Sequence, residues 1–303
     1  MNLRIHTSKS VKETIHYHTG KKSQEEYYST DGQEFAGCWG GKGAELLGLK
    51  GCVTDEAFAR LCSNLHPLTG EKLTPRMRGD RRPGFDCNFN CPKSVSLLYA
   101  YTHDDRIIQA LRQAQYDTLM EMQERAATRV RSGGVKDGDR ITGNLVWAEI
   151  IHLTARPVDG IPDPHLHSHC YVFNVTWDDV EKKWKALQMG LIKEDADYYD
   201  RAVTMRLKAN LQSLGVKIVP TKDAFEIEGI CRELIEKFSR RTRTIEETAQ
   251  RLGITDPVQK AKLAALTRER KARSLLMSEM EPFWWGNLLP EERKALEANK
   301  TLL

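Results

Sequence analysis

The sequence predicts an α+β domain in which helices cover one side of a sheet. Segments 144–155 and 165–177 are rich in β-branched and aromatic residues, as strands are. Other segments, such as 105–131, repeat apolar residues at helical spacing. Strands and helices follow one another in mixed order, which is typical of the α+β class. The 303 residues suffice for one large domain, or for a domain with an appendage.

The first half of the chain contains a glycine-rich turn, a strand and a long helix. Residues 37–51, GCWGGKGAELLGLKG, match neither a phosphate loop nor a dinucleotide fingerprint, so we expect a turn leading into a short helix. Apolar and polar side chains alternate from Phe85 to Asn90, which predicts a strand with one apolar and one polar face. Pro92 ends this strand and suits the first turn of a helix. Helical spacing then predicts a helix over 105–131.

The second half begins with a pair of strands that form a hairpin. Segments 144–155 and 165–177 are separated by RPVDGIPDP, in which Asp159-Gly160 is a strong hairpin signal. Further helices are expected over 191–214, and the tail beyond residue 230 is expected to be wholly helical and charged.

Three of the nine histidines lie at alternate positions of the second strand, in DPHLHSHCYVFNV (163–175). His165, His167 and His169 therefore project from one face. A turn at the hairpin signal pairs residues whose numbers sum to 319, which places His152 directly opposite His167. We expect His152, His167 and His169 to bind one divalent ion, with positions left open for substrate or water. On its parity His165 is either a further ligand or a residue just outside the ligand set.

Other metal folds fit these histidines poorly. A metallo-β-lactamase run, H-x-H-x-D-H, would need aspartate and histidine where the chain has Cys170 and Tyr171. An amidohydrolase barrel would need further histidines, and none follows His169. The remaining alternative is an exposed strand of histidines that binds no ion.

A carboxylate and a group of tyrosines complete the candidate site. Asp86 lies on the polar face of its strand, where it could orient a metal-binding imidazole, accept a proton from a nucleophile, or simply be a surface aspartate. Tyr17, Tyr27 and Tyr28 lie in the polar segment IHYHTGKKSQEEYYST (15–30). A tyrosine hydroxyl titrates near pH 10, so a nucleophilic role requires activation by a metal-bound phosphate, a base or both. Without such activation these tyrosines are structural.

The positive charge of the chain is concentrated in its tail. Residues 237–273 carry eleven Lys or Arg against four Asp or Glu, a net +7, whereas the whole chain carries +4. A solvated helical face would explain this run, but its clustering favours phosphate contacts by Arg240, Arg241 and Arg243. Trp284 and Trp285 are expected to be packing or base-stacking residues.

Composition excludes several other classes. No apolar run reaches the roughly 20 residues of a membrane span, and the N-terminal segment lacks the apolar stretch of a secretion signal, so we expect a cytoplasmic protein without membrane insertion. Seven cysteines without a C-x-x-C pair suggest neither a disulfide framework nor a zinc knuckle, and reduced buried thiols are expected. The lack of a P-loop excludes nucleotide hydrolysis by that route.

Taken together, the tyrosine cluster, RPGFDCNFNCPKS and the histidine set resemble the MobF-class conjugative relaxases, the TrwC/TraI type of HUH endonuclease. GGKGAELLGLKG, TGNLVWAE, FNVTWDD and EKFSRRT extend the similarity over nearly the whole chain. The resemblance implies an HUH relaxase palm, a central antiparallel sheet flanked by helices, with a catalytic core over 1–230 and a helical DNA-clamping segment over 231–303. The same fold also occurs in relaxases that continue into a helicase.

The resemblance also implies roles for individual residues. The HUH element matches His167 and His169, the third ligand matches His152, and the catalytic carboxylate matches Asp86. One adjacent tyrosine pair of the family matches Tyr27-Tyr28, whereas the other is degraded to His16-Tyr17-His18, which makes Tyr17 the favoured nucleophile.

The implied reaction is site- and strand-specific nicking and rejoining at a transfer origin of a plasmid or integrative element. Tyrosine attack on a metal-polarised phosphodiester would give a 5′-phosphotyrosine and a free 3′-hydroxyl. The family works with Mg²⁺ or Mn²⁺, although three neutral nitrogens also suit Zn²⁺. The implied partners are single-stranded DNA with a nick site beside a hairpin at oriT, accessory transfer proteins and a coupling protein. Alternatives are an HUH rolling-circle replication initiator or transposase, and a non-catalytic single-stranded DNA-binding module.

Overall fold

The computed structural model describes residues 2–19, 35, 37–75, 81–132, 135–222, 224–267, 275–286 and 288–302. At its centre is a five-stranded antiparallel sheet with the strand order β1-β3-β7-β6-β2. Its strands are β1 (Asn2–Thr7), β3 (Gly84–Asn90), β7 (Pro164–Phe173), β6 (Trp147–Thr154) and β2 (Cys38–Gly40). The predicted α+β class and antiparallel sheet are confirmed.

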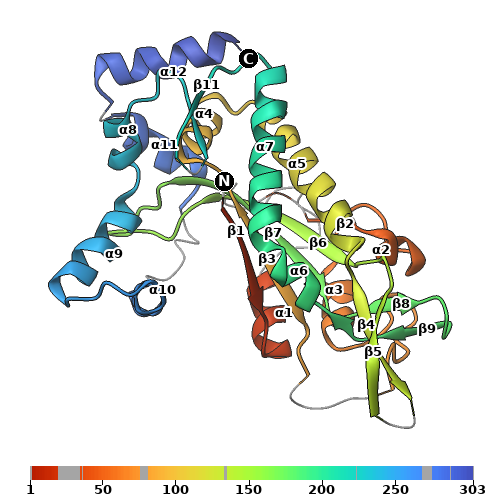
Figure 1. The fold of residues 1–303 in the computed structure, drawn as a ribbon. Coiled ribbons are helices and arrows are strands. Elements are labelled where there is room, and N and C mark those ends of the chain that lie inside the picture. Colours follow the sequence, from red (N-terminus) through yellow and green to blue (C-terminus); the bar gives the residue numbers. More distant parts are fainter. Residues whose placement is uncertain are drawn as a thin grey trace.

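Helices cover both faces of this sheet, although coverage of one side was predicted (Figure 1). On one face, the apolar side chains of β3, β6 and β7 pack in one core with α4 (Lys93–Thr102), α5 (Asp105–Gln123) and α7 (Ala196–Ser213). On the other face, a second core joins the sheet to α2 (Lys42–Leu46) and α3 (Asp55–Cys62), and α1 (Val11–Thr19) packs against it. Sequence periodicity identified the helices but could not assign the short ones to a face.

The glycine-rich segment forms the predicted turn and short helix. Gly41 precedes α2 with a φ of 97°, a conformation that L side chains rarely adopt. A Cβ at this position would stand 2.2 Å from the carbonyl oxygen of Leu145. Glycine is therefore required for the chain to turn here against the strand β6.

The expected helix over 105–131 is wrong at its C-terminal end. Helix α5 ends at Gln123, and the chain continues into β4 (Ala127–Ser132), which pairs with β5 (Val135–Ile141). The β-branched residues Thr128 and Val130 favour a strand. The apolar spacing of the helix nevertheless continues through this segment, and for this reason the sequence pattern predicted a longer helix. A third strand, β10 (Leu187–Gln188), completes this small sheet.

Two further expected elements are interrupted. The strand expected over 165–177 is β7 followed, after Asn174, by β8 (Thr176–Asp178), which pairs with β9 (Lys183–Lys185). The helix expected over 191–214 is α6 (Gly190–Glu194) followed by α7, with a break at Asp195. A polar residue lies at each interruption, Asn174 in the first and Asp195 in the second.

The tail is helical, as predicted, in the part that the structure describes. It follows β11 (Ile218–Pro220) and β12 (Phe225–Ile227), and its helices are α8 (Arg232–Lys237), α9 (Arg240–Arg251), α10 (Pro257–Leu266), α11 (Met277–Gly286) and α12 (Pro290–Leu302). Leu234, Phe238, Trp284 and Leu296 are buried in the same core as the central sheet. The tail therefore shares the main core, and a boundary at residue 230 stays a prediction.

None of the helices that the structure describes is both long and apolar enough to cross a membrane.

Candidate functional site

The β6–β7 hairpin places two histidines directly opposite each other. Its turn residues, Asp159 and Gly160, have φ angles of 54° and 79°, the positive values that a two-residue type I′ turn requires. His152 pairs with His167, and Ile150 pairs with His169. The predicted register is confirmed over this stretch, and it shifts between His152 and Thr154, near the prolines.

His152, His167 and His169 converge on one point of the sheet. Their ring centroids lie 4.9 to 5.3 Å apart, and their exposed fractions are 7%, 9% and 4%. One possible ligand atom from each residue lies within 4.8 Å of the other two. Among the residues that the structure describes, they form the one group of His, Cys, Asp or Glu able to hold a metal ion.

Hydrogen bonds orient two of these imidazoles. Nδ1 of His169 lies 2.8 and 2.9 Å from the two carboxylate oxygens of Asp86, and Nδ1 of His167 lies 2.9 Å from the backbone oxygen of His165. These acceptors make Nδ1 the protonated nitrogen in the neutral rings, so that each Nε2 carries the lone pair. The Nε2 atoms of His167 and His169 are thus available to a divalent ion, together with one ring nitrogen of His152.

The strand pairing β3–β7 brings Asp86 to this position, with its side chain 17% exposed. Burial alone would raise the pKa of Asp86. The charge and hydrogen bond of His169, with smaller effects of His18 and His6, outweigh burial and place the pKa of Asp86 below its usual value. The carboxylate is therefore ionised at neutral pH and fixes the ring of His169.

His165 lies outside the convergent group. Its ring stacks on that of His167 at 4.6 Å, and its Nε2 lies 3.1 Å from the Asn90 side-chain oxygen. Burial, with the neighbouring charges of His167, Lys93 and His169, holds the pKa of His165 well below its usual value. The ring is thus a neutral neighbour that supports His167.

Tyr17 reaches the histidines from helix α1. Its hydroxyl lies 3.4 Å from Nε2 of His169, and the residue is 45% exposed. Tyr27 and Tyr28, the other predicted tyrosines, lie outside the described residues. Tyr17, the one predicted tyrosine among the described residues, thus lies beside the candidate metal site.

Further polar residues surround the site. The Asn88 amide lies 3.4 Å from Nε2 of His169, and the His18 ring packs on Tyr171 at 5.0 Å and faces His169 at 6.1 Å. On β1, Arg4 pairs with Asn88 and His6 pairs with Asp86. Alternation in NLRIHT identifies Arg4 and His6 as polar-face residues, but sequence reasoning missed that β1 is a neighbour of β3.

A groove of about 810 Å³ is lined by the four histidines, Tyr17, His18, Asp86 and Asn88. One wall comes from α1 and β1, the floor from β3, β6 and β7, and the other wall from α9 and α10 of the tail. Its basic lining residues are Arg4, Lys9, Lys93, Arg156 and Arg241. The tail therefore borders the histidines.

The three predicted DNA-contacting arginines differ in their surroundings. The backbone N–H and Nε of Arg240 donate to the buried Asp163 carboxylate at 2.9 and 2.7 Å, and its Nη2 donates to the Ile161 oxygen at 2.8 Å. Arg241 donates to the backbone oxygens of Ala264 and Thr267. Arg243 is exposed.

The two tryptophans of the tail are packing residues. Trp284 is 1% exposed, and its indole N–H donates to the Pro162 oxygen at 2.9 Å. Trp285 packs against the core, with its ring 5.3 Å from that of Tyr101. Trp284 thus links α11 to the β6–β7 hairpin, and its burial excludes base stacking.

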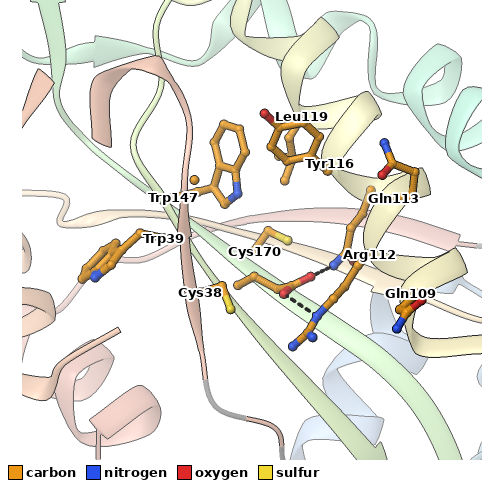
Figure 2. A pocket seen from close by; sticks show the side chains of 12 residues that line it. Cys38, Trp39, Gln109, Arg112, Gln113, Tyr116, Leu119, Trp147 and Cys170 are labelled. Carbon is orange, nitrogen blue, oxygen red and sulfur yellow. Dashed lines mark hydrogen bonds and ion pairs between the residues drawn. The ribbon is translucent and has the colours of Figure 1, made fainter. Parts of the chain in front are cut away.

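A second pocket of about 560 Å³ lies on the opposite face of the sheet, between β2, β6 and α5 (Figure 2). Glu149 is the buried charge at its base, hydrogen-bonded by Arg112 at 3.1 Å and by Gln115. Burial raises the pKa of Glu149, and Arg112 opposes this effect. Tyr116 and Trp147, whose ring centroids lie 6.2 Å apart, form an aromatic wall, and Cys38 lines the edge.

Comparison with known proteins extends these observations. The sequence pattern of a protein family described as TrwC relaxase matches residues 11–288 of the chain. The multifunctional conjugation protein TraI of Escherichia coli (strain K12) is 32% identical over 266 residues, which cover 84% of this chain and 14% of TraI. The chain thus spans a small part of that relative.

Two solved structures share the whole fold. A copper-bound complex of the conjugative relaxase TrwC with oriT DNA has a TM-score of 0.83 and 29% identity, covering 97% of this chain and 98% of that one. TrwC with a 27-mer DNA comprising the recognition hairpin and the cleavage site has a TM-score of 0.81 and 27% identity, covering the same shares. Their likeness includes the helical tail, because nearly all of both chains is matched.

Proposed function

The chain belongs to the TrwC relaxase family, and we propose that it nicks and rejoins one DNA strand at a conjugative transfer origin. One observation carries the proposal: the hydroxyl of Tyr17 lies 3.4 Å from Nε2 of His169, at the point where three buried histidines converge. A nucleophile beside a cation site is the arrangement that transfer of a phosphodiester to a tyrosine requires.

We infer that His152, His167 and His169 hold one divalent cation. Such an ion would supply positive charge to the non-bridging oxygens of the scissile phosphate. The acceptors on Nδ1 of His167 and His169 support this role, because both rings then turn the same nitrogen toward the site. Imidazoles suit Zn²⁺ and Cu²⁺ as well as Mn²⁺, so the choice among these ions and Mg²⁺ belongs to experiment.

We assign the nucleophile to Tyr17. Its oxygen forms a bond to phosphorus while the bond from phosphorus to the 3′ oxygen breaks, which leaves a 5′-phosphotyrosine and a 3′-hydroxyl. The tyrosine loses one proton and the leaving 3′ oxygen gains one. The phosphate ester retains the bond energy, so the 3′-hydroxyl can attack it and restore the strand. Asp86 acts through His169, whose ring it orients.

We propose single-stranded DNA beside a hairpin as the substrate. The solved relative TrwC binds a recognition hairpin and a cleavage site, and the groove here is lined by several basic side chains. The helices α9 and α10 border the groove, which supports a clamping role of the tail. Accessory transfer proteins and a coupling protein are the partners that a conjugative role would require.

Trapping the covalent intermediate tests this function. The 303-residue protein is incubated with labelled oligonucleotides that tile the transfer origin, with each of Mg²⁺, Mn²⁺, Zn²⁺ and Cu²⁺ or with a chelator. We expect a covalent adduct on a denaturing gel, peptide mapping that places the 5′ phosphate on Tyr17, and no adduct with Tyr17→Phe. Tyr116→Phe is the matched control, because Tyr116 is similarly exposed but lines the second pocket.

Three results would overturn the assignment. A 3′ linkage would contradict the chemistry, and products released by water without an adduct would exclude a tyrosine nucleophile. An adduct mapped to Tyr27 or Tyr28 in the wild type would move the nucleophile away from Tyr17. In a parallel assay with replication-origin oligonucleotides, cleavage of these and not of the transfer-origin set would favour a rolling-circle initiator.

A further inference from the structure

A row of cysteines crosses the central sheet on the face opposite the histidines. Cys87 pairs with Cys170, Cys170 with Glu149, and Glu149 with Cys38. The row ends at an isolated antiparallel bridge between Cys38 and Cys52. Directly paired residues point to the same face of a sheet, so the two terminal thiols are neighbours.

The hydrogen bonds around the terminal pair define its geometry. The N–H of Trp39 donates to the Gly51 oxygen at 3.0 Å, and the N–H of Val53 donates to the Gly37 oxygen at 2.7 Å. Bonds made by the flanking residues identify Cys38 and Cys52 as a non-hydrogen-bonded pair, whose Cα atoms lie about 4.5 Å apart. This separation falls within the range of roughly 4.4 to 6.8 Å that a disulfide spans.

Gly37 keeps the two segments close. A Cβ at this position would stand 2.9 Å from the Glu149 oxygen and 3.2 Å from Cβ of Val53. The backbone therefore approaches both neighbours more closely than other residues would allow. The hydrogen bond from Val53 to Gly37, which flanks the cysteine pair, lies at this close approach.

The two thiols differ in accessibility. Cys52 is exposed, whereas Cys38 is half-buried and lines the second pocket, where Figure 2 shows its sulfur on the side of the Arg112–Glu149 ion pair. Burial first, and then the charge of Glu149, raises the pKa of Cys38. A reagent from solution therefore meets Cys52 first, and Cys38 is the thiol that reacts second.

We propose that Cys38 and Cys52 form a thiol–disulfide exchange site that takes low-molecular-weight disulfides as its co-reactant. The Cys52 thiolate attacks one sulfur of the small disulfide, forms a mixed disulfide and releases one small thiol. The Cys38 thiolate then attacks the Cys52 sulfur, which releases the second small thiol and leaves a cross-strand disulfide. The two protein thiols are oxidised and the small disulfide is reduced. This inference does not depend on the proposed DNA chemistry.

Exchange with oxidised glutathione on the folded 303-residue protein tests the site. A Cys231→Ser background removes the other exposed cysteine, which caps helix α8 far along the chain. Intact mass and peptide mapping follow the reaction without denaturant, and free thiols are alkylated before digestion. Circular dichroism checks that each variant is folded.

We expect the Cys231→Ser protein to lose the mass of two hydrogens, to retain no glutathione and to yield a linked Cys38–Cys52 peptide. With Cys38→Ser added, Cys52 should retain one glutathione, because the second thiol is absent. With Cys52→Ser added, most of the protein should stay unmodified. Dithiothreitol should restore the starting mass in every case.

Two outcomes would overturn the proposal. In the first, the parent protein retains glutathione on Cys52 without the linked peptide, which would mean that Cys38 cannot reach it. In the second, neither thiol reacts while added free cysteine is oxidised under the same conditions. A linked peptide that appears only after denaturation counts as the second outcome.

Discussion

His169 donates a hydrogen bond from Nδ1 to Asp86, whose carboxylate oxygens lie 2.8 and 2.9 Å away. The two residues are 83 positions apart, and the pairing of β3 with β7 brings them together. The bond fixes which nitrogen of His169 faces Tyr17 and the other histidines. A residue that holds a ligand in this way controls metal affinity without contacting the ion.

The first prediction concerns Asp86→Asn. We expect metal affinity and nicking to fall about 10- to 100-fold, as is typical when the outer partner of a histidine ligand is changed. Isothermal titration with a divalent ion and a nicking assay measure the two effects, and oligonucleotide binding in chelator should persist. Asp105→Asn, an exposed change on α5, is the control. Equal metal affinity in both variants would refute the orienting role of Asp86.

Removal of a ligand itself should have a larger effect. We expect His152→Ala, His167→Ala and His169→Ala each to lower metal affinity and nicking by more than about 100-fold, beyond the range for outer partners. His165→Ala should have a smaller effect, because His165 only packs on His167 and bonds Asn90. Thermal melting shows whether the fold survives. Unchanged metal binding and activity in all three alanine variants would disprove the site.

Arg243 is the predicted phosphate contact that the structure leaves exposed. We expect Arg243→Ala to weaken binding of single-stranded DNA and to reduce the slope of log affinity against log salt by about 0.7. Fluorescence anisotropy at graded salt concentrations measures both quantities. Arg232→Ala, on the exposed surface of α8, should leave the slope unchanged. If the two variants have the same slope as the wild type, Arg243 does not contact the DNA backbone.

Substitution of Arg240 should lower the free energy of unfolding more than it changes the salt dependence of DNA binding. The Arg240 side chain pairs with Asp163, whose side chain is 4% exposed. Arg240→Ala removes the guanidinium from this buried carboxylate and leaves it the backbone N–H of residue 240. We expect the free energy of unfolding to fall by about 3 kcal/mol. Urea unfolding of Arg240→Ala, Asp163→Asn and the double variant gives the coupling between the two residues. Additive losses would show that the ion pair contributes no coupling.

The lowered pKa of Lys93 predicts that the stability of the protein depends on pH. Burial lowers the pKa of Lys93 from 10.5 to about 8, against the opposing charges of Asp163 and Glu226. Between these values the unfolded chain binds more protons than the folded one, so the contribution of Lys93 to stability rises with pH through this window. The difference in unfolding free energy between wild type and Lys93→Met should therefore grow by on the order of 1 to 3 kcal/mol.

Urea unfolding at graded pH measures this difference. Lys294→Met, an exposed change on α12, should show no growth over the same window. A difference for Lys93→Met that falls as pH rises would give the opposite sign and contradict the lowered pKa.

The sequence predicts the hairpin site well, because its determinants are local. Side-chain alternation and a turn with two positive φ angles are enough to set His152 opposite His167. The polar face of β3 follows from alternation in the same way. The contact of Asp86 with His169 rests instead on strand order, which local patterns do not encode. Family resemblance identified Asp86 as the matching carboxylate but did not predict its neighbouring strand.

Charge patterns were less informative about the tail. They identify Arg240, Arg241 and Arg243 as one basic cluster, but only the folded chain supplies Asp163 and the carbonyl oxygens at the end of α10. The helix expected over 105–131 fails for a related reason. Pairing of β4 with β5 overrides an apolar periodicity that continues past Gln123.

The central position of β7 in the sheet has a consequence for which residues of the site are held rigidly. Because β3 and β6 pair with it on both sides, exchange of its backbone amides with deuterium requires opening of the sheet itself. We therefore expect His167 and His169 to lie in the slowest-exchanging part of the chain, with their geometry preorganised before any ligand arrives. Tyr17 lies instead on the nine-residue helix α1, outside the sheet, and we expect this helix to open at a smaller free-energy cost. We therefore expect the proposed nucleophile to be able to withdraw and return while the three histidines stay in place.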